Sequence, residues 1–245
     1  MNVKILMLIV AMGMVTLTGC GKSGPELRQE ADKLYESESQ QDRKKAFGLY
    51  LEAAKKGDAA AQYKVGGLYL YFKEYDKAAV ALQEASDQGH SDAQVLLGIL
   101  YLNGQGVKQS NEKAYRLFTI SAEQGSAMGQ TKLAHMYLSG DYLVKNYAKA
   151  LELYKKAANQ GYIQAINQIG FMYISSGYGI QDHNEAEKWY LKSANRGDEL
   201  AQYQLGWLYE YNKEYKKALK WYRMAAEQGN ATAIKRVEYF ERNGL

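Results

Sequence analysis

The chain has 245 residues with a formal net charge of +4, one proline and one cysteine. Its 31 basic residues are interspersed with 27 acidic ones, whereas a nucleic-acid binder concentrates positive charge on one face or arm, so nucleic-acid binding is not expected. A single cysteine excludes an internal disulfide, and the three histidines lie far apart in sequence, so neither a metal site nor another cofactor is expected.

Residues 1–19 have the features of a secretion signal. Lys4 precedes an uncharged apolar stretch, Ile5 to Thr18, which is shorter than the ~20 residues needed to span a bilayer. The sequence therefore predicts a cleaved signal peptide here instead of a transmembrane helix.

The segment Leu17-Thr18-Gly19-Cys20 resembles the bacterial lipobox. This resemblance implies cleavage before Cys20 and fatty acylation, such as palmitate, on that cysteine, and two or more acyl chains anchor a protein stably to a membrane. Residues 20–25 would form the lipidated tether. Gly21, in place of an aspartate, implies the periplasmic face of the outer membrane in a bacterial envelope. The alternative is an ordinary signal peptide followed by an incidental cysteine.

The remainder of the chain repeats itself every 32 or 36 residues. Six glycines close similar alanine-rich segments, and an alanine stands eleven residues before each of them. The glycines are Gly57, Gly89, Gly125, Gly161, Gly197 and Gly229, and the alanines are Ala46, Ala78, Ala114, Ala150, Ala186 and Ala218. Periods of this length are typical of solenoids built from stacked structural repeats.

Each period predicts two helices, which we call helix A and helix B. In the last full period, residues 201–211 (A) and 215–228 (B) both carry apolar or small residues at helical spacing. A small residue recurs in helix A and is expected to let the two helix axes approach closely: Gly66, Gly98, Ala134, Gly170 and Gly206. The glycine after helix B is expected to take the left-handed conformation that ends many helices.

Three of the connections between helix A and helix B contain a glycine-bearing insertion. Within these insertions, Val107, Val144 and Ile180 are expected to occupy one equivalent place beneath the helices. Three good N-cap residues stand four positions before the helix-B alanine, namely Ser110, Asn146 and Asp182.

The pattern A-Q-x-x-L-G-x-x-Y, then G-x-G-V, then K-A-x-x-x-Y-x-x-A-A-x-x-G resembles the Sel-one-like repeat family of the tetratricopeptide superfamily. Gly104, Gly106 and Val107 match the loop, and Lys149-Ala150, Tyr154 and Ala157-Ala158 match helix B, while Ala134 departs from the helix-A glycine. The resemblance covers about residues 44–229. It implies an all-α, right-handed α/α superhelical solenoid.

One solenoid is expected over residues 26–245. Its full repeats are predicted at about 58–89, 90–125, 126–161, 162–197 and 198–229. A partial repeat over 26–57 would precede them, beginning with a helix over 26–39. A capping helix over 230–243, with Asn230 as its N-cap, would end the array with a polar face, as stacked repeats require.

Catalytic motifs are absent from the sequence. It contains no G-x-S-x-G, no Walker-type phosphate loop and no H-E-x-x-H, and acid pairs such as Glu185 and Glu187 are typical of solvated helix faces. We therefore do not expect an enzyme or a small-molecule substrate. A cell-wall hydrolase, the least favoured alternative, would require a convergent cluster of titratable groups.

Helix A lines the concave face in tetratricopeptide-like arrays, and the resemblance places one register of side chains inward. The partner-binding residues expected on that basis are Tyr63, Tyr71, Ile99, His135, Phe171, Tyr203, Trp207 and Tyr211, with Val95, Asn103, Thr131 and Asn167 in the same register. Aromatic anchors flanked by polar groups suit a protein interface. The alternative is that several of them simply pack between adjacent repeats.

The favoured function is a membrane-anchored periplasmic scaffold or adaptor that holds a protein or peptide partner in its groove. A sharper alternative follows from the resemblance, because some lipidated Sel-one-like proteins neutralise toxic phospholipase effectors delivered into the periplasm. The chain would then be an immunity protein. The sequence leaves both open.

Overall fold

The computed structural model describes residues 21–140 and 142–244. The signal peptide and Cys20 predicted above lie outside these residues. Every regular element within the described part is helical, which confirms the all-α fold class. The chain divides into two compact units, one ending at Gln124 and one beginning at Gly125. We describe each unit by itself.

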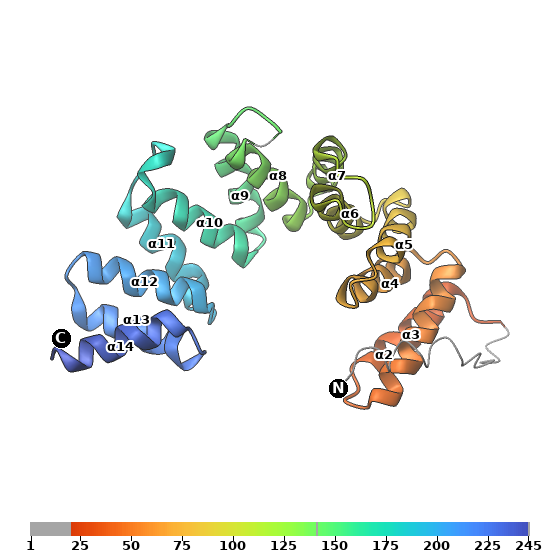
Figure 1. The fold of residues 1–245 in the computed structure, drawn as a ribbon, viewed down its shortest axis with the longest axis horizontal. Coiled ribbons are helices and arrows are strands. Elements are labelled where there is room, and N and C mark those ends of the chain that lie inside the picture. The colour runs from red at the N-terminus through yellow and green to blue at the C-terminus, as the bar shows by residue number, and fades with distance from the viewer. Residues whose placement is uncertain (1–20, 141, 245) are drawn as a thin grey trace. The chain divides into compact units, whose positions relative to one another are not determined.

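Unit 1 consists of three helical hairpins, α2–α3, α4–α5 and α6–α7, each packed against the next along the chain (Figure 1). Its helices are α2 (Gly24–Tyr35), α3 (Gln40–Lys55), α4 (Ala59–Tyr71), α5 (Tyr75–Asp87), α6 (Ser91–Asn103) and α7 (Asn111–Glu123).

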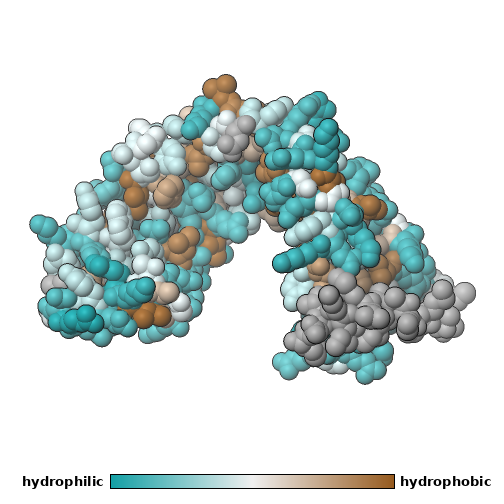
Figure 2. Space-filling view, viewed as in Figure 1, coloured by the Kyte–Doolittle hydropathy of each residue, from teal (hydrophilic) through white to brown (hydrophobic). Residues whose placement is uncertain are grey.

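Unit 2 repeats this plan with hairpins α8–α9, α10–α11 and α12–α13, and its last helix, α14, packs against α13 (Figure 1). The elements are α8 (Ala127–Ser139), α9 (Tyr147–Asn159), α10 (Ile163–Ile174), the short 3₁₀ turn η1 (Ser176–Tyr178), α11 (His183–Ala194), α12 (Glu199–Tyr211), α13 (Tyr215–Glu227) and α14 (Ala231–Arg242). In each unit, hydrophobic residues form small areas on a mostly hydrophilic surface (Figure 2).

The N-terminal hairpin differs from the prediction at both ends of its first helix. The helix α2 begins at Gly24 instead of residue 26, because Ser23 caps it and donates from its backbone N–H and its hydroxyl to the Glu26 carboxylate, at 2.7 and 2.8 Å. It ends at Tyr35, well before Ser39, because Ser39 caps α3 by accepting from the backbone N–H of Asp42. The expected tether over 20–25 is therefore wrong for its last residues, which are part of the fold.

The predicted caps are confirmed. The side chains of Ser110, Asn146, Asp182 and Asn230 each accept a hydrogen bond from the backbone N–H three residues further on. The six glycines that follow helix B have φ between +79° and +93°, the left-handed region in which a β-carbon is penalised. The links between repeats are thus short because a cap and a left-handed glycine together reverse the chain.

The small residues of helix A do let the helices approach closely. A β-carbon built on Gly206 would lie 2.5 Å from the ring of Tyr222, and one on Gly98 would lie 2.5 Å from the ring of Phe118. Both rings are fully buried. Each hairpin core therefore consists of a large side chain from helix B seated on a nearly bare stretch of helix A.

One loop expectation is wrong. Val107 and Ile180 are half-buried, but Val144 is 91% exposed. Leu143, which stands 36 residues after Val107, is half-buried instead, while Val144 stands 36 residues before Ile180, so the three loops do not share one register.

Candidate functional site

Three of the predicted partner-binding residues lie in unit 1, and they differ in exposure. Tyr71 is 78% exposed at the end of α4, and Ile99 is half-buried on α6. Tyr63 is half-buried and stacks on His90, with ring centroids 4.6 Å apart. His90 is also the N-cap of α6, so this pair is part of the junction between two repeats. Val95, in the same register, is fully buried.

The predicted residues of unit 2 lie on α8, α10 and α12. On α12, Trp207 stacks on Tyr211 with centroids 5.6 Å apart, and the His183 ring meets Tyr211 edge-on at 5.0 Å. Trp207 is half-exposed and Tyr211 is 62% exposed. We call Trp207, Tyr211 and His183 the α12 aromatic cluster.

The remaining positions of this register become more polar toward α8. Phe171 on α10 is 43% exposed, and His135 on α8 is exposed. Tyr203 packs on Tyr222, 5.8 Å between centroids. Thr131 and Asn167 are buried. Some members of this register are therefore accessible on the surface, and others are packed within the fold.

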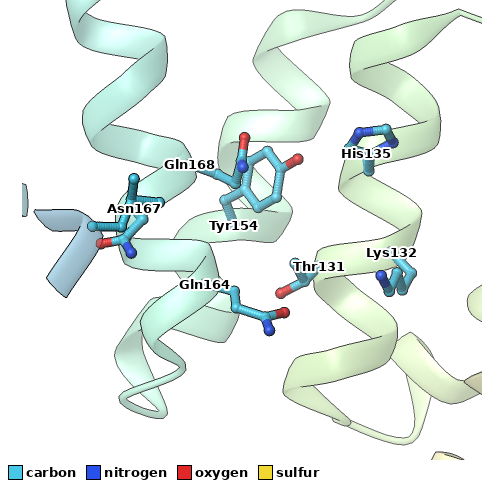
Figure 3. Close-up of a pocket in the computed structure, with 8 residues that line it drawn as sticks. Thr131, Lys132, His135, Tyr154, Gln164, Asn167 and Gln168 are labelled. Carbon is cyan, nitrogen blue, oxygen red and sulfur yellow. The ribbon is translucent and has the colours of Figure 1, made fainter. Parts of the chain in front are cut away.

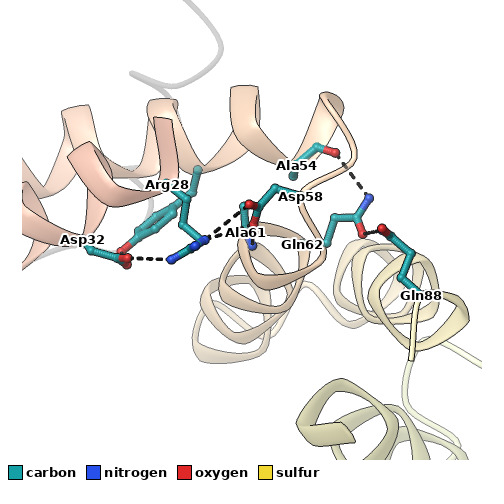
Figure 4. Close-up of polar contacts among 8 residues, drawn as sticks. Arg28, Asp32, Ala54, Asp58, Ala61, Gln62 and Gln88 are labelled. Carbon is teal, nitrogen blue, oxygen red and sulfur yellow. Dashed lines mark hydrogen bonds and ion pairs between the residues drawn. The ribbon is translucent and has the colours of Figure 1, made fainter. Parts of the chain in front are cut away.

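The glutamine of the A-Q motif has a structural role. In unit 1, Gln62 donates to the carbonyl of Ala54 and its own side-chain oxygen accepts from Gln88 at 2.6 Å (Figure 4). In unit 2, Gln202 makes the same bonds with Ala194 and Gln228. These bonds satisfy buried polar groups where one repeat meets the next, so we do not assign the glutamines to a binding site.

The neighbouring cap also ties two repeats together in unit 1. Asp58 accepts from the backbone N–H of Ala61 at the start of α4, and Arg28 from α2 donates to the same carboxylate at 3.1 Å (Figure 4). Asp32 accepts from Arg28 and from the Tyr50 hydroxyl. This network joins α2, α3 and α4, and its charged groups are accordingly structural.

A pocket of about 200 Å³ opens between α8 and α10 in unit 2 (Figure 3). Its wall on α8 is Thr131, Lys132 and His135, and its floor is Tyr154 from α9. Facing them from α10 are Gln164, Asn167 and Gln168, and Leu200 completes the lining. The sequence placed only Thr131, His135 and Asn167 in a binding register, and it identified Tyr154 as a match to the helix-B pattern.

The Tyr154 hydroxyl is the unusual group in this pocket. The residue has no exposed surface, and its hydroxyl oxygen has no hydrogen-bond partner within the described part of the chain. Burial raises the pKa of this phenol above the ordinary tyrosine value, so the group stays protonated and can donate. An unpaired buried hydroxyl costs about 1–3 kcal/mol, which makes it the strongest single pointer to a missing ligand.

The described residues contain no group of three or more histidine, cysteine, aspartate or glutamate side chains placed to hold a metal ion. Over the same residues, no helix combines the length and the apolar character needed to cross a membrane.

Comparison with known proteins identifies the repeats. The family model described as Sel1 repeat matches residues 34–58, 59–79, 91–126, 127–162, 163–198 and 200–230. No match was found among curated protein sequences.

Solved structures with the same architecture include three relatives of interest. A protective antigen of uropathogenic Escherichia coli strains is 29% identical with a TM-score of 0.75, covering 100% of this chain, and the chain spans about half of that protein, 52%. A Sel1 repeat protein from Oxalobacter formigenes is 26% identical with a TM-score of 0.76, over 97% of this chain and 68% of its own. An immunity protein from Pseudomonas aeruginosa is 23% identical with a TM-score of 0.52, over 71% of this chain and 67% of its own.

Proposed function

This chain belongs to the Sel1 repeat family, whose arrays are protein-interaction scaffolds, and we propose on that premise that it is a protein-binding module anchored in the bacterial envelope. The partner would lie along the surface of helix A, and the anchor would be lipidated Cys20 at the periplasmic face of the outer membrane.

The observation that supports partner binding is the α12 aromatic cluster. Trp207 and Tyr211 present stacked rings to solvent, and their position is fixed by contact with each other and with His183. Rigid aromatic side chains lose little conformational entropy on binding and dominate the energetics of many interfaces. An aromatic stack that the fold holds in place and leaves partly exposed is well suited to bind a partner from outside.

The start of the fold supports a short anchor. Lys56 donates to the carbonyl of Lys22, and Lys22 pairs with Glu30, so Lys22 is already held against the first hairpin. Only Gly21 separates it from Cys20. Since one extended residue spans about 3.5 Å, a lipid on Cys20 would keep α2 and α3 close to the membrane surface.

Partner binding is tested by crosslinking in intact envelopes, affinity purification and mass spectrometry. We expect a stoichiometric partner with the unaltered protein and its loss with the double variant Trp207→Ala/Tyr211→Ala. Trp189→Ala is the matched control, because Trp189 lies on α11, a helix B, under Lys192. If the partner survives the double variant while the thermal midpoint falls, the cluster is packing and the proposal is wrong.

The anchor is tested separately. Cys20→Ser should move the protein from the outer-membrane fraction to the soluble periplasmic fraction, and mass spectrometry of the unaltered protein should find fatty acids on Cys20. A Cys20→Ser protein that stays in the membrane fraction would contradict lipid anchoring.

A second candidate function is immunity against a toxic effector that acts in the periplasm, such as a phospholipase. It is motivated by the solved immunity protein with the same fold. Co-expression of a periplasm-directed phospholipase effector from the same organism should arrest growth, and this protein should restore it. If the unaltered protein restores growth and Trp207→Ala/Tyr211→Ala does not, immunity through the helix-A surface is favoured. If the unaltered protein does not restore growth, the scaffold function is favoured.

A further inference from the structure

We propose that the pocket between α8 and α10 binds a carboxylate of the protein partner, with Tyr154 and Lys132 as its principal donors. The inference deepens the proposed function and rests on it for the source of the carboxylate. The ligand chemistry itself is argued from the pocket alone.

The first argument is that three other buried tyrosines of this protein donate from their hydroxyls to carboxylates. Tyr50 donates to Asp32 at 2.7 Å, Tyr209 donates to Glu187 at 2.5 Å, and Tyr222 donates to Glu210 at 2.8 Å. In each case the acceptor is a carboxylate from a neighbouring helix. Hydrogen bonds to an ionised acceptor are shorter and stronger than neutral ones.

Tyr154 occupies the same place in its repeat as Tyr222, four residues after the register alanine of helix B. The residue of α8 that corresponds to Glu210 of α12 is Leu138, 72 residues earlier. An internal carboxylate is therefore missing from the hairpin α8–α9, and the hydroxyl of Tyr154 is left without an acceptor. Figure 3 shows this hydroxyl directed toward the α8 side of the pocket, where His135 stands.

The second argument is charge. The helices α8 and α10 contain no aspartate or glutamate, and Lys132 makes no ion pair or hydrogen bond with any residue that the structure describes. An acidic side chain, Asp198, contacts the lining residue Asn167. Its carboxylate already accepts hydrogen bonds from the Asn167 side chain and from the backbone N–H of Ala201, both at 2.8 Å. Among the described residues that line the pocket, Lys132 is therefore a cation without an ion-pair partner and none is acidic, which favours a negatively charged guest.

The third argument is space. A cavity of about 200 Å³ holds several water molecules at ~30 Å³ each, or one carboxylate-bearing side chain. The hydroxyl itself is buried, and the pocket is lined by side chains that include Lys132 and Gln168, which are long, unbranched and only partly buried. A rotation of these side chains would admit the guest without moving a helix.

The test uses three small probes and the purified full chain, observed by NMR of backbone amides. N-acetylglutamate α-amide carries only a side-chain carboxylate, its isomer N-acetylglutamine carries only a terminal carboxylate, and N-acetylglutamine amide is neutral. We expect saturable shifts in α8 and α10 with one or both anions and not with the neutral probe. The pattern distinguishes an acidic side chain from a chain terminus as the source.

Two variants complete the test. Tyr154→Phe should weaken the binding of the anion about tenfold, the loss expected for one charge-assisted hydrogen bond, without lowering the thermal midpoint. Lys132→Gln should weaken it about two- to fivefold, as expected for one partly exposed charge. Absence of binding by both anions, equal binding of the neutral probe, or full affinity in Tyr154→Phe would overturn the proposal and leave a pocket that holds water only. Because the probes need no partner, this result is independent of the α12 cluster experiment.

Discussion

The hairpins α8–α9 and α12–α13 of unit 2 have the same backbone plan and nearly opposite surfaces. On α12 the partner-binding register reads Tyr203, Trp207 and Tyr211, and on α8 it reads Thr131, His135 and Ser139. Beneath it lies a fully buried tyrosine in each case, Tyr222 and Tyr154.

The difference lies in what covers and satisfies that tyrosine. Tyr203 packs on the ring of Tyr222, and Glu210 accepts from its hydroxyl. Thr131 is too small to cover Tyr154 in this way, and Leu138 cannot accept from it. The two hairpins therefore share a buried tyrosine, and they differ in whether helix A supplies an acceptor for its hydroxyl.

The largest effect is expected from Gly206→Ala, which gives α12 the residue that α8 has at this place. The new β-carbon would lie 2.5 Å from the Tyr222 ring, which is held by Tyr203, Phe240 and Glu210 and cannot withdraw. Overpacking of this kind costs about 1–3 kcal/mol, so we expect the free energy of unfolding, measured by urea denaturation, to fall by about 2 kcal/mol. The reverse change, Ala134→Gly, should cost about 1–2 kcal/mol, because it removes a buried methyl group as well as helix propensity. A Gly206→Ala protein as stable as the unaltered one would mean that the Tyr222 ring can withdraw.

A smaller contrast is expected between two tyrosine-to-phenylalanine variants. Tyr222→Phe removes the donor to Glu210 and should lower the free energy of unfolding by about 1–2 kcal/mol, with Arg236 retaining part of the interaction with that carboxylate. Tyr154→Phe removes a hydroxyl that has no partner in the described structure, so its stability should be unchanged or slightly higher. Thermal unfolding of both variants measures the contrast, and a clear loss with Tyr154→Phe would show that its hydroxyl is already satisfied within the protein.

The turns of the two hairpins differ as well. Gly140 ends α8 in the left-handed region at φ +77°, but the α12–α13 turn places Lys213 there at φ +63°. A residue with a β-carbon is strained in that region, and glycine relieves the strain at some cost in unfolded-chain entropy. We expect Lys213→Gly to raise the free energy of unfolding by about 0.5–1 kcal/mol. Lys216→Gly, the same change at an exposed helical position, should lower it by about 1 kcal/mol, and a loss in both would remove the strain argument.

The sequence predicted most of what the backbone does. The spacing of glycines and alanines identified the repeats, and the left-handed φ of Gly161 and the cap at Asn146 follow from residue chemistry that acts within a few positions. The helix-A small residues were also interpreted correctly, because a recurrent glycine inside a helix needs a packing reason.

The sequence predicted the burial of the helix-A residues less well. Val95 and Asn167 share a register with Trp207 but are buried, because burial depends on the neighbouring repeat as much as on helix register. Tyr154 was identified only as a match to the helix-B pattern, and its ring lies in the core. Whether its hydroxyl finds an acceptor depends on residues of other helices. The sequence contains one indication of this, because Leu138 stands where the repeat of α12 has Glu210. Only a position-by-position comparison of the repeats would have found it.

The last prediction transfers the closed arrangement to the open hairpin. Thr131→Tyr should place a ring over Tyr154 as Tyr203 lies over Tyr222, filling the pocket and abolishing the amide shifts caused by the anionic probes. We expect a change in stability within about 1 kcal/mol, because the new side chain enters existing space. Thr232→Tyr, the same change at an exposed position of α14, should leave probe binding intact.

The reverse variant, Tyr203→Thr, should not create a second site, since the Tyr222 hydroxyl still donates to Glu210. If Tyr203→Thr did bind the anions, the space beside the ring and not the missing carboxylate would be what makes a site in this fold.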